Sequence, residues 1–146
     1  MEQLVLVVGT DKIVQNKPFQ GYSTDVHDHI PKLLEPSNNF FMLRSQAEQD
    51  VRYKQIIPYI VLRYKDSLFS YIRGKKSSES RLVAMRSIGV GGHIEPGDQS
   101  LFSSDVEMYL QAAQREVHEE VMVEVPYVDH IVALINDDST DVGKVH

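Results

Sequence analysis

The chain has 146 residues, of which 42% are hydrophobic and 25% charged, as in one ordinary globular domain with its own core. It contains no cysteine, which excludes disulfide scaffolds, thiol catalysis, and zinc or iron–sulfur sites built on cysteine. The 15 Lys and Arg residues against 21 Asp and Glu residues give a net charge of −6, which disfavours a stable complex with nucleic acid. No apolar run approaches the roughly 18 residues of a membrane span, and the N-terminus lacks the cationic start of a signal peptide. We therefore expect a cytoplasmic protein without a membrane partner.

The first third of the chain contains two predicted strands and one predicted helix. The apolar run Leu4–Val8 is typical of a strand. A short helix is expected within residues 24–34, a second strand over 40–44, and a polar connection over 45–53. We interpret residues 1–53 as an N-terminal extension of strand and helix that packs on the core of a single compact domain.

The next segment predicts a β-hairpin followed by a basic loop. Residues 55–64 give the clearest strand signal, and Pro58 within them indicates an edge position or a bulge. A turn leads to a second strand over 68–73. The polar loop that follows is either solvated surface or a loop that faces phosphate groups. The candidate phosphate-binding cations are Arg63, Arg73, Lys75, Lys76, Arg81 and Arg86.

An acidic, amphipathic helix is predicted from about residue 105 to Val121, with Ser103 or Ser104 as its N-cap. Its expected apolar stripe consists of Val106, Leu110, Ala113, Val117 and Val121. Three carboxylates, Glu116, Glu119 and Glu120, share a fan about 100° wide beside this stripe. Such like charges repel one another on a solvated helix, whereas a cation with oxygen ligands such as Mg²⁺ would neutralise them. The helix alone leaves two interpretations open, a metal site or a solvated acidic face.

Beyond this helix, Tyr127–Ile135 is a strand candidate, and residues 136–141 predict a turn. Residues 142–146 are predicted to begin a further element of secondary structure.

A glycine-rich loop before the helix adds to this pattern. Residues 91–98 together with 115–120 resemble the Nudix box of the Nudix hydrolase (MutT-type) superfamily, Gly-x5-Glu-x7-Arg-Glu-U-x-Glu-Glu-x-Gly-U, in which U is a bulky apolar residue. Gly92 takes the place of the first glycine, and Asp98 stands where the pattern has its first Glu. The second half of the pattern is matched by Arg115, Glu116, Val117, Glu119, Glu120 and Val123.

The match departs from the pattern in three places. Sixteen residues separate Asp98 from Arg115 where the pattern has seven, so the loop or the helix start must be longer. Met122 replaces the closing glycine, which normally ends a helix in a left-handed conformation, so the helix is expected to end differently. The family fold usually continues with more strand and a second helix, and we expect the Nudix-type domain, residues 54–146, to be short at its C-terminus.

The resemblance implies an α/β fold, an α/β/α sandwich with a mixed sheet on which the acidic helix packs. It also implies hydrolysis of a diphosphate linkage in a nucleoside diphosphate derivative or a similar small phosphorylated compound, with Mg²⁺ or Mn²⁺ as cofactor.

The resemblance assigns roles to individual residues. Glu116, Glu119, Glu120 and the carbonyl of Gly91 would hold the metal. Arg115 would pair with a helix carboxylate and fix its rotamer. Either Glu119 or Glu120 would serve as general base. The substrate phosphates would be held by Arg73, Lys75, Lys76 and Arg86.

Other functions remain open at this point. A non-catalytic Nudix-type module that binds a ligand is the main alternative, although such a module has no need for three neighbouring carboxylates. Isoprenoid diphosphate isomerisation, another use of this fold, typically requires a catalytic cysteine, and the chain has none. A homodimer is possible because an unfinished sheet edge invites pairing.

Overall fold

The computed structural model describes residues 2–15, 18–74, 85–99 and 104–146. Its helices are α1 (Thr10–Gln15), α2 (Val26–Leu34), α3 (Arg44–Ala47) and α4 (Asp105–Glu120), and a 3-10 turn, η2, covers Pro96–Asp98. Its strands are β1 (Leu4–Gly9), β2 (Gly21–Ser23), β3 (Asn39–Leu43), β4 (Tyr53–Gln55), β5 (Tyr59–Val61), β6 (Arg63–Tyr64), β7 (Ser67–Leu68), β8 (Tyr71–Ile72), β9 (Arg86–Ser87), β10 (Gly89–Gly91) and β11 (Leu134–Asn136). Within these described ranges, no helix is both long and apolar enough to cross a membrane.

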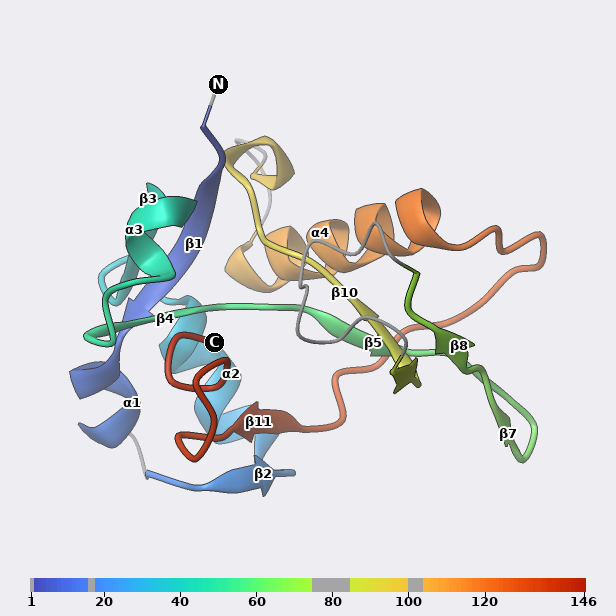
Figure 1. Cartoon of the computed structure of the whole chain (residues 1–146), viewed down its shortest axis with the longest axis horizontal. Coiled ribbons are helices and arrows are strands. Elements are labelled where there is room, and N and C mark those ends of the chain that lie inside the picture. The colour runs from blue at the N-terminus through green and yellow to red at the C-terminus, as the bar shows by residue number, and fades with distance from the viewer. Residues whose placement is uncertain (1, 16–17, 75–84, 100–103) are drawn as a thin grey trace.

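Strand β1, predicted from its apolar run, is the central strand of a three-stranded sheet. It pairs with β3 on one side and β4 on the other, in the order β3-β1-β4 (Figure 1). Leu6 joins a core cluster with Leu34 of α2 and with Met108 and Ala112 of α4. The neighbouring Val5 and Val7 pack with Ala47 of α3 in a second cluster. Because successive side chains of a strand point to opposite faces, helices cover both faces of this sheet.

The remaining strands form small sheets. The described pairs are β5–β10, β2–β11, β6–β7 and β8–β9, and all of them, like the pairs in the central sheet, are antiparallel. The expected mixed sheet is therefore not seen among the described strands. The α/β/α layering comes instead from a short antiparallel sheet between helices.

The sequence predicts one continuous strand over 55–64, and this prediction was wrong. It is divided among β4, β5 and β6, which belong to three different sheets. Figure 1 shows β4 and β5 as parts of one extended run. Pro58, which lies between them and is fully buried, has no N–H to give to a ladder, so the pairing partner changes there.

The predicted hairpin is also shorter than expected. Only β6 and β7 pair across the Lys65–Asp66 turn, where Lys65 adopts a left-handed conformation with φ 53°. The following strand, β8, pairs instead with β9. The one-turn helix α3 lies mostly in the segment predicted as a polar connection. Its first residue, Arg44, pairs at 2.7 Å with Glu48, which follows its last residue.

The segment after α4 is mostly extended chain rather than the predicted strand over Tyr127–Ile135. Within the described residues, only Leu134–Asn136 forms a strand there, paired with β2. Residues 127–130 are all exposed, so the first half of this stretch has no apolar face turned toward the core that would fix a register.

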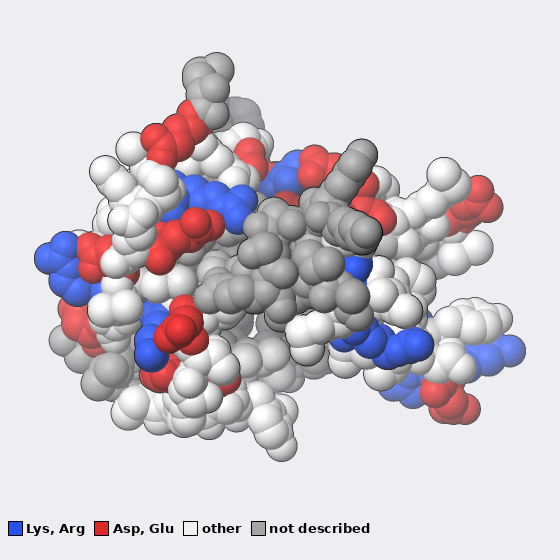
Figure 2. Space-filling model, in the orientation of Figure 1, with Lys and Arg blue, Asp and Glu red and all other residues white. Residues whose placement is uncertain are grey.

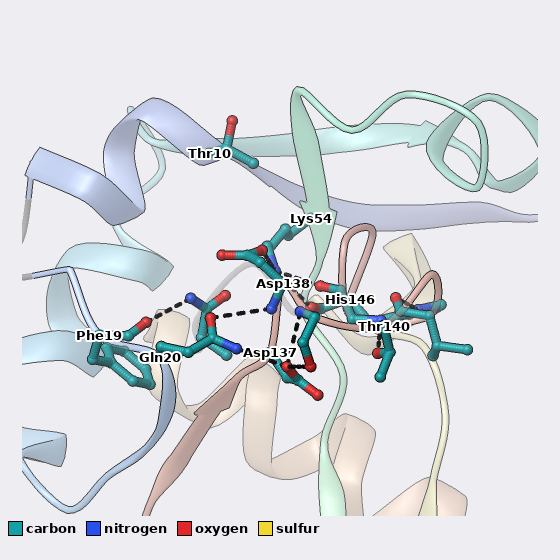
Figure 3. Close-up of polar contacts among 12 residues, drawn as sticks. Thr10, Phe19, Gln20, Lys54, Asp137, Asp138, Thr140 and His146 are labelled. Atoms are coloured by element: carbon teal, nitrogen blue, oxygen red, sulfur yellow. Dashed lines mark hydrogen bonds and ion pairs between the residues drawn. The ribbon is translucent and has the colours of Figure 1, made fainter.

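The C-terminal residues form a turn held against β4. Lys54 is almost fully buried, and its Nζ pairs with Asp138 at 2.7 Å and donates to the carbonyls of Gly143 and His146 (Figure 3). The backbone N–H of Gln55 donates to Val145 O at 2.9 Å. The buried ammonium group is thus satisfied by the turn that covers it, as a buried charge requires.

The buried stripe of α4 differs from the predicted one. Its buried residues are Met108, Ala112, Ala113, Glu116 and Val117, whereas Val106, Leu110 and Val121 are only partly buried. Compared with the predicted stripe, the buried face of α4 is turned toward the side that carries the carboxylates. Ala112 on this face is small enough to let the helix approach Leu6 and Ile94 closely. One of the three clustered carboxylates, Glu116, therefore lies at the buried interface.

The core predicts a specific mutational effect. Ile94→Ala should lower the free energy of unfolding by about 2–5 kcal/mol, because Ile94 is fully buried against Leu6 and Met108. Ile72→Ala, at a position 64% exposed, is the matched control and should cost about 0.5 kcal/mol or less. Chemical denaturation would measure both, and equal losses would contradict this account of the core.

Candidate functional site

The glycine-rich loop is fixed along the edge of the central strand. Leu6 N donates to Ile94 O at 3.0 Å, and the Ile94 side chain enters the core. The loop then closes in η2, where Asp98 N donates to Glu95 O at 3.0 Å and Asp98 Oδ2 accepts from Glu95 N at 2.8 Å. These two hydrogen bonds set the direction of the Asp98 carboxylate.

Six residues separate η2, which ends at Asp98, from α4, which begins at Asp105, so the longer spacing is taken up partly before the helix and partly in its first turn. Helix α4 begins with a capping box, in which Glu107 N donates to Ser104 Oγ at 3.3 Å and Ser104 N donates to Glu107 Oε2 at 2.6 Å. Ser104 is thus the N-cap, one of the two predicted candidates. Part of the insertion, residues 100–103, lies outside the described residues. Despite the insertion, Asp98 and Arg115 are in direct contact.

The guanidinium group of Arg115 uses all five of its N–H donors. Its Nε and one Nη2 hydrogen bind both oxygens of Asp98, at 2.8 and 2.9 Å, and the other Nη2 hydrogen binds His93 O at 2.9 Å. Its Nη1 donates to Glu116 at 2.8 Å and to Glu119 at 3.4 Å. Asp98, whose side chain is 5% exposed, is paired in the bidentate geometry that Arg favours. The hydrogen bonds that Arg115 donates, above all those to Asp98, raise the pKa of Arg115 above its usual range.

Glu116 lies in a space that a glycine leaves open. A Cβ atom placed on Gly92 would come within 2.0 Å of the Glu116 carboxyl carbon and 2.1 Å of both its oxygens. Burial raises the pKa of Glu116, against the effect of Arg115, and the charges of Glu119 and Glu120 raise it further. Arg115 therefore does not fully offset the cost of burying the ionised form of Glu116.

The other two carboxylates are exposed. Glu119, with a side chain 58% exposed, reaches Arg115, and Glu120 points away from the buried face of α4. An open hollow of about 320 Å³ lies beside them at the end of the helix and is lined by His118, Glu119, Glu120, Val121, Met122 and Val123. In the part of the chain that the structure describes, no three His, Asp or Glu side chains converge into a preformed metal cage.

The end of α4 explains how Met122 is accommodated. The helix stops at Glu120, and Val121 is extended, with φ −138° and ψ 133°, while its N–H still donates to Val117 O at 2.9 Å. No left-handed residue is used at this end, so a glycine is not required. The altered helix end that the sequence predicted is therefore found, and Met122 itself is 86% exposed.

His93 follows Gly92 directly and packs beside the site. Its Nε2 atom is buried and has no hydrogen-bond partner among the described residues. Burial, aided by Arg44 and His146, lowers the pKa of His93 to about 4. Its ring is therefore neutral near pH 7.

The predicted phosphate-binding cations are only partly described. Lys75, Lys76 and Arg81 lie outside the described residues. Arg86 is exposed on β9 and donates to Ser70 Oγ at 2.8 Å, and Arg73 follows β8 and is joined to Met85 through its backbone. Neither makes a hydrogen bond or ion pair with the box residues in the described ranges. Figure 2 shows acidic and basic side chains interspersed over the described part of one face.

The structure also adds residues to which the sequence assigned no role. Glu95 caps the turn that carries Asp98, and its side chain accepts a hydrogen bond from Gln3 at 2.7 Å. The spacing of Glu95, Pro96 and Asp98 is a local capping signal that could have been found. The contact between Gln3 and Glu95 spans 92 residues and has no local signal.

The donor set fits a hard divalent cation. The three helix carboxylates and the carbonyl of Gly91 are all oxygen donors, as Mg²⁺ and Mn²⁺ prefer. Burial raises the pKa of Glu116, and a cation beside it would lower that pKa again by stabilising the ionised form. Gly92 already gives that carboxylate the space it needs.

Arg115 should be essential to the stability of this cluster. Arg115→Ala should cost about 3–5 kcal/mol, because it leaves the buried Asp98 carboxylate without its partner. The double variant Asp98→Asn with Arg115→Ala should lose much less than the sum of the two single changes. Urea denaturation of all four proteins would measure this, and additive losses would contradict the pairing.

The neutral state of His93 should appear in the pH dependence of stability. Between its unfolded pKa near 6.5 and its folded pKa of about 4, the unfolded chain binds more protons, so stability should fall as pH falls through this window. His93→Gln does not titrate and should show a shallower decline. Melting temperatures from pH 7 to pH 4 would test this, and equal slopes would count against a buried neutral His93.

Comparisons with known proteins place this geometry in a family. No family model matches the chain. Protein YmaB of Bacillus subtilis (strain 168) is 35% identical over 153 aligned residues, which cover 100% of this chain and 72% of YmaB. Among solved structures, "Crystal structure of Tm1382, a putative Nudix hydrolase" matches with a TM-score of 0.76 at 31% identity, over 99% of this chain and 71% of that one. These similarities confirm the resemblance and the predicted fold class.

Proposed function

Because the chain belongs to the Nudix hydrolase superfamily, we propose that it is a metal-dependent hydrolase that cleaves a diphosphate linkage in a nucleoside diphosphate derivative or a similar compound. The observation that carries this proposal is the arrangement around Arg115, which gathers Asp98, Glu116 and Glu119 beside the glycine loop. A surface helix that served only stability would gain nothing from such crowded like charges.

The proposed metal ligands are Glu116, Glu119, Glu120 and the carbonyl of Gly91. A bound Mg²⁺ or Mn²⁺ would supply neutralisation of the diphosphate charge and a lower pKa for a coordinated water. The chain's own contribution is positional. Arg115 holds Glu116 in one rotamer by a 2.8 Å bond, and Gly92 leaves room for that rotamer.

The exposed carboxylates are the groups that a substrate can reach. Glu119 and Glu120 border the hollow at the end of α4, and one of them would accept a proton from the attacking water. Arg73, Lys75, Lys76 and Arg86 remain the proposed contacts to substrate phosphates. The cytoplasmic location and the possible homodimer also stay predictions.

Activity should depend on metal and on the exposed carboxylates. With a panel of nucleoside diphosphate derivatives, the wild type should release phosphate or nucleoside monophosphate with Mg²⁺ or Mn²⁺ but not with EDTA. Glu120→Gln and Glu119→Gln should each lower kcat by about 10²–10⁴-fold if that residue is the general base, with little change in melting temperature. Glu124→Gln, an exposed change beyond the helix, is the matched control and should leave kcat unchanged.

The outcomes separate the proposed hydrolase from the alternative. Release that persists in EDTA, or that is equal in all three variants, would contradict the proposed mechanism. Absence of release from every compound, with Mn²⁺ binding retained, would support a ligand-binding module of the same fold instead.

A further inference from the structure

Gln3, just before β1, connects two distant parts of the fold through its side-chain amide. Its Oε1 accepts from Arg44 Nη1 at 2.9 Å, and its Nε2 donates to Glu95 Oε1 at 2.7 Å. Its backbone carbonyl also accepts from Arg44 N at 2.9 Å. The amide is therefore held on both sides, and its orientation is set by a donor at one end and a carboxylate at the other.

Glu95 in turn sets the turn that presents Asp98. The N–H of Glu95 donates to Asp98 Oδ2 at 2.8 Å, and the carbonyl of Glu95 accepts from Asp98 N at 3.0 Å. Asp98 then binds Arg115 with both oxygens, and Arg115 binds Glu116 and Glu119. Gln3 thus bonds the side chain of Glu95, the backbone of Glu95 bonds Asp98, and the hydrogen bonds continue through Arg115 to the carboxylates of α4.

We propose that Gln3 is a positioning residue for these carboxylates and acts through Glu95, Asp98 and Arg115. This proposal rests on the proposed function of the α4 carboxylates. An amide suits the position because it accepts from a cation and donates to an anion at the same time. A Glu side chain would retain the contact with Arg44 but would repel Glu95, whereas a Met side chain has a similar shape without either hydrogen bond.

The effect of Gln3 can be read at Arg115 without any substrate. The Arg115 Nε–H is bonded to Asp98 at 2.8 Å, so its rate of exchange with solvent reports on that contact. In Gln3→Met, NMR should show this exchange accelerated about fivefold or more, and in Gln3→Glu it should be faster still. Gln46→Met, at an exposed position of α3, is the matched control and should exchange at the wild-type rate.

Turnover supplies the second measurement. With the best substrate of the panel, Gln3→Met should lower kcat about three- to tenfold, and Gln3→Glu should lower it further, with KM changed less than twofold in both. The melting temperature of Gln3→Met should stay close to that of the control, since two part-buried side-chain hydrogen bonds are lost rather than a core contact.

Each outcome decides the proposal. Wild-type exchange at Arg115 in a folded Gln3→Met variant would overturn it, as would an equal acceleration in Gln46→Met. If the wild type hydrolyses nothing, the proposed hydrolase fails, yet the exchange rates still decide whether Gln3 positions Arg115. If the wild type is active and exchange changes without any loss of kcat, Gln3 supports the turn alone and the positioning role is wrong.

Discussion

The guanidinium group of Arg115 is the interaction on which the rest of the site depends. It satisfies the buried carboxylate of Asp98, holds Glu116, reaches Glu119 and closes the glycine loop through the carbonyl of His93. Charges buried in this way are stable only when each has its partner, so the loop and the helix must be placed together. One side chain therefore determines both where η2 lies against α4 and which carboxylates remain free for a ligand.

The central sheet makes this arrangement possible. Ile94 and Leu6 share a core cluster with Met108 and Ala112, so the loop, β1 and α4 are packed against one another before any polar contact is considered. Ala112 allows the helix to approach, and Gly92 leaves the space that the Glu116 carboxylate occupies. The consequence is a buried carboxylate that Arg115 pairs but whose pKa burial still raises, so an added divalent cation would stabilise its ionised form.

Local sequence signals predicted the elements with a strong pattern. The run at β1, the helix α4 and its N-cap at Ser104 follow from periodicity and capping, and the box residues mark the cluster around Arg115. The failures arise where pairing is decided at long range. The predicted strand over 55–64 is divided among three sheets, with Pro58 between the first two of its parts. Tyr127–Ile135 has strand composition but lacks a neighbouring strand over most of its length. The contact between Gln3 and Glu95 could not be predicted, because nothing local in either segment indicates the other.

The central claim is that the α4 carboxylates and the glycine loop form one cation site organised by Arg115. The most direct test is a crystal structure of the full chain grown with Mn²⁺, with an anomalous difference map collected above the manganese absorption edge. The account predicts a peak in contact with Glu116, with at least one of Glu119 and Glu120, and with the carbonyl of Gly91, while Arg115 keeps its bidentate bond to Asp98. A peak only elsewhere in the molecule, or none at saturating Mn²⁺, would contradict it.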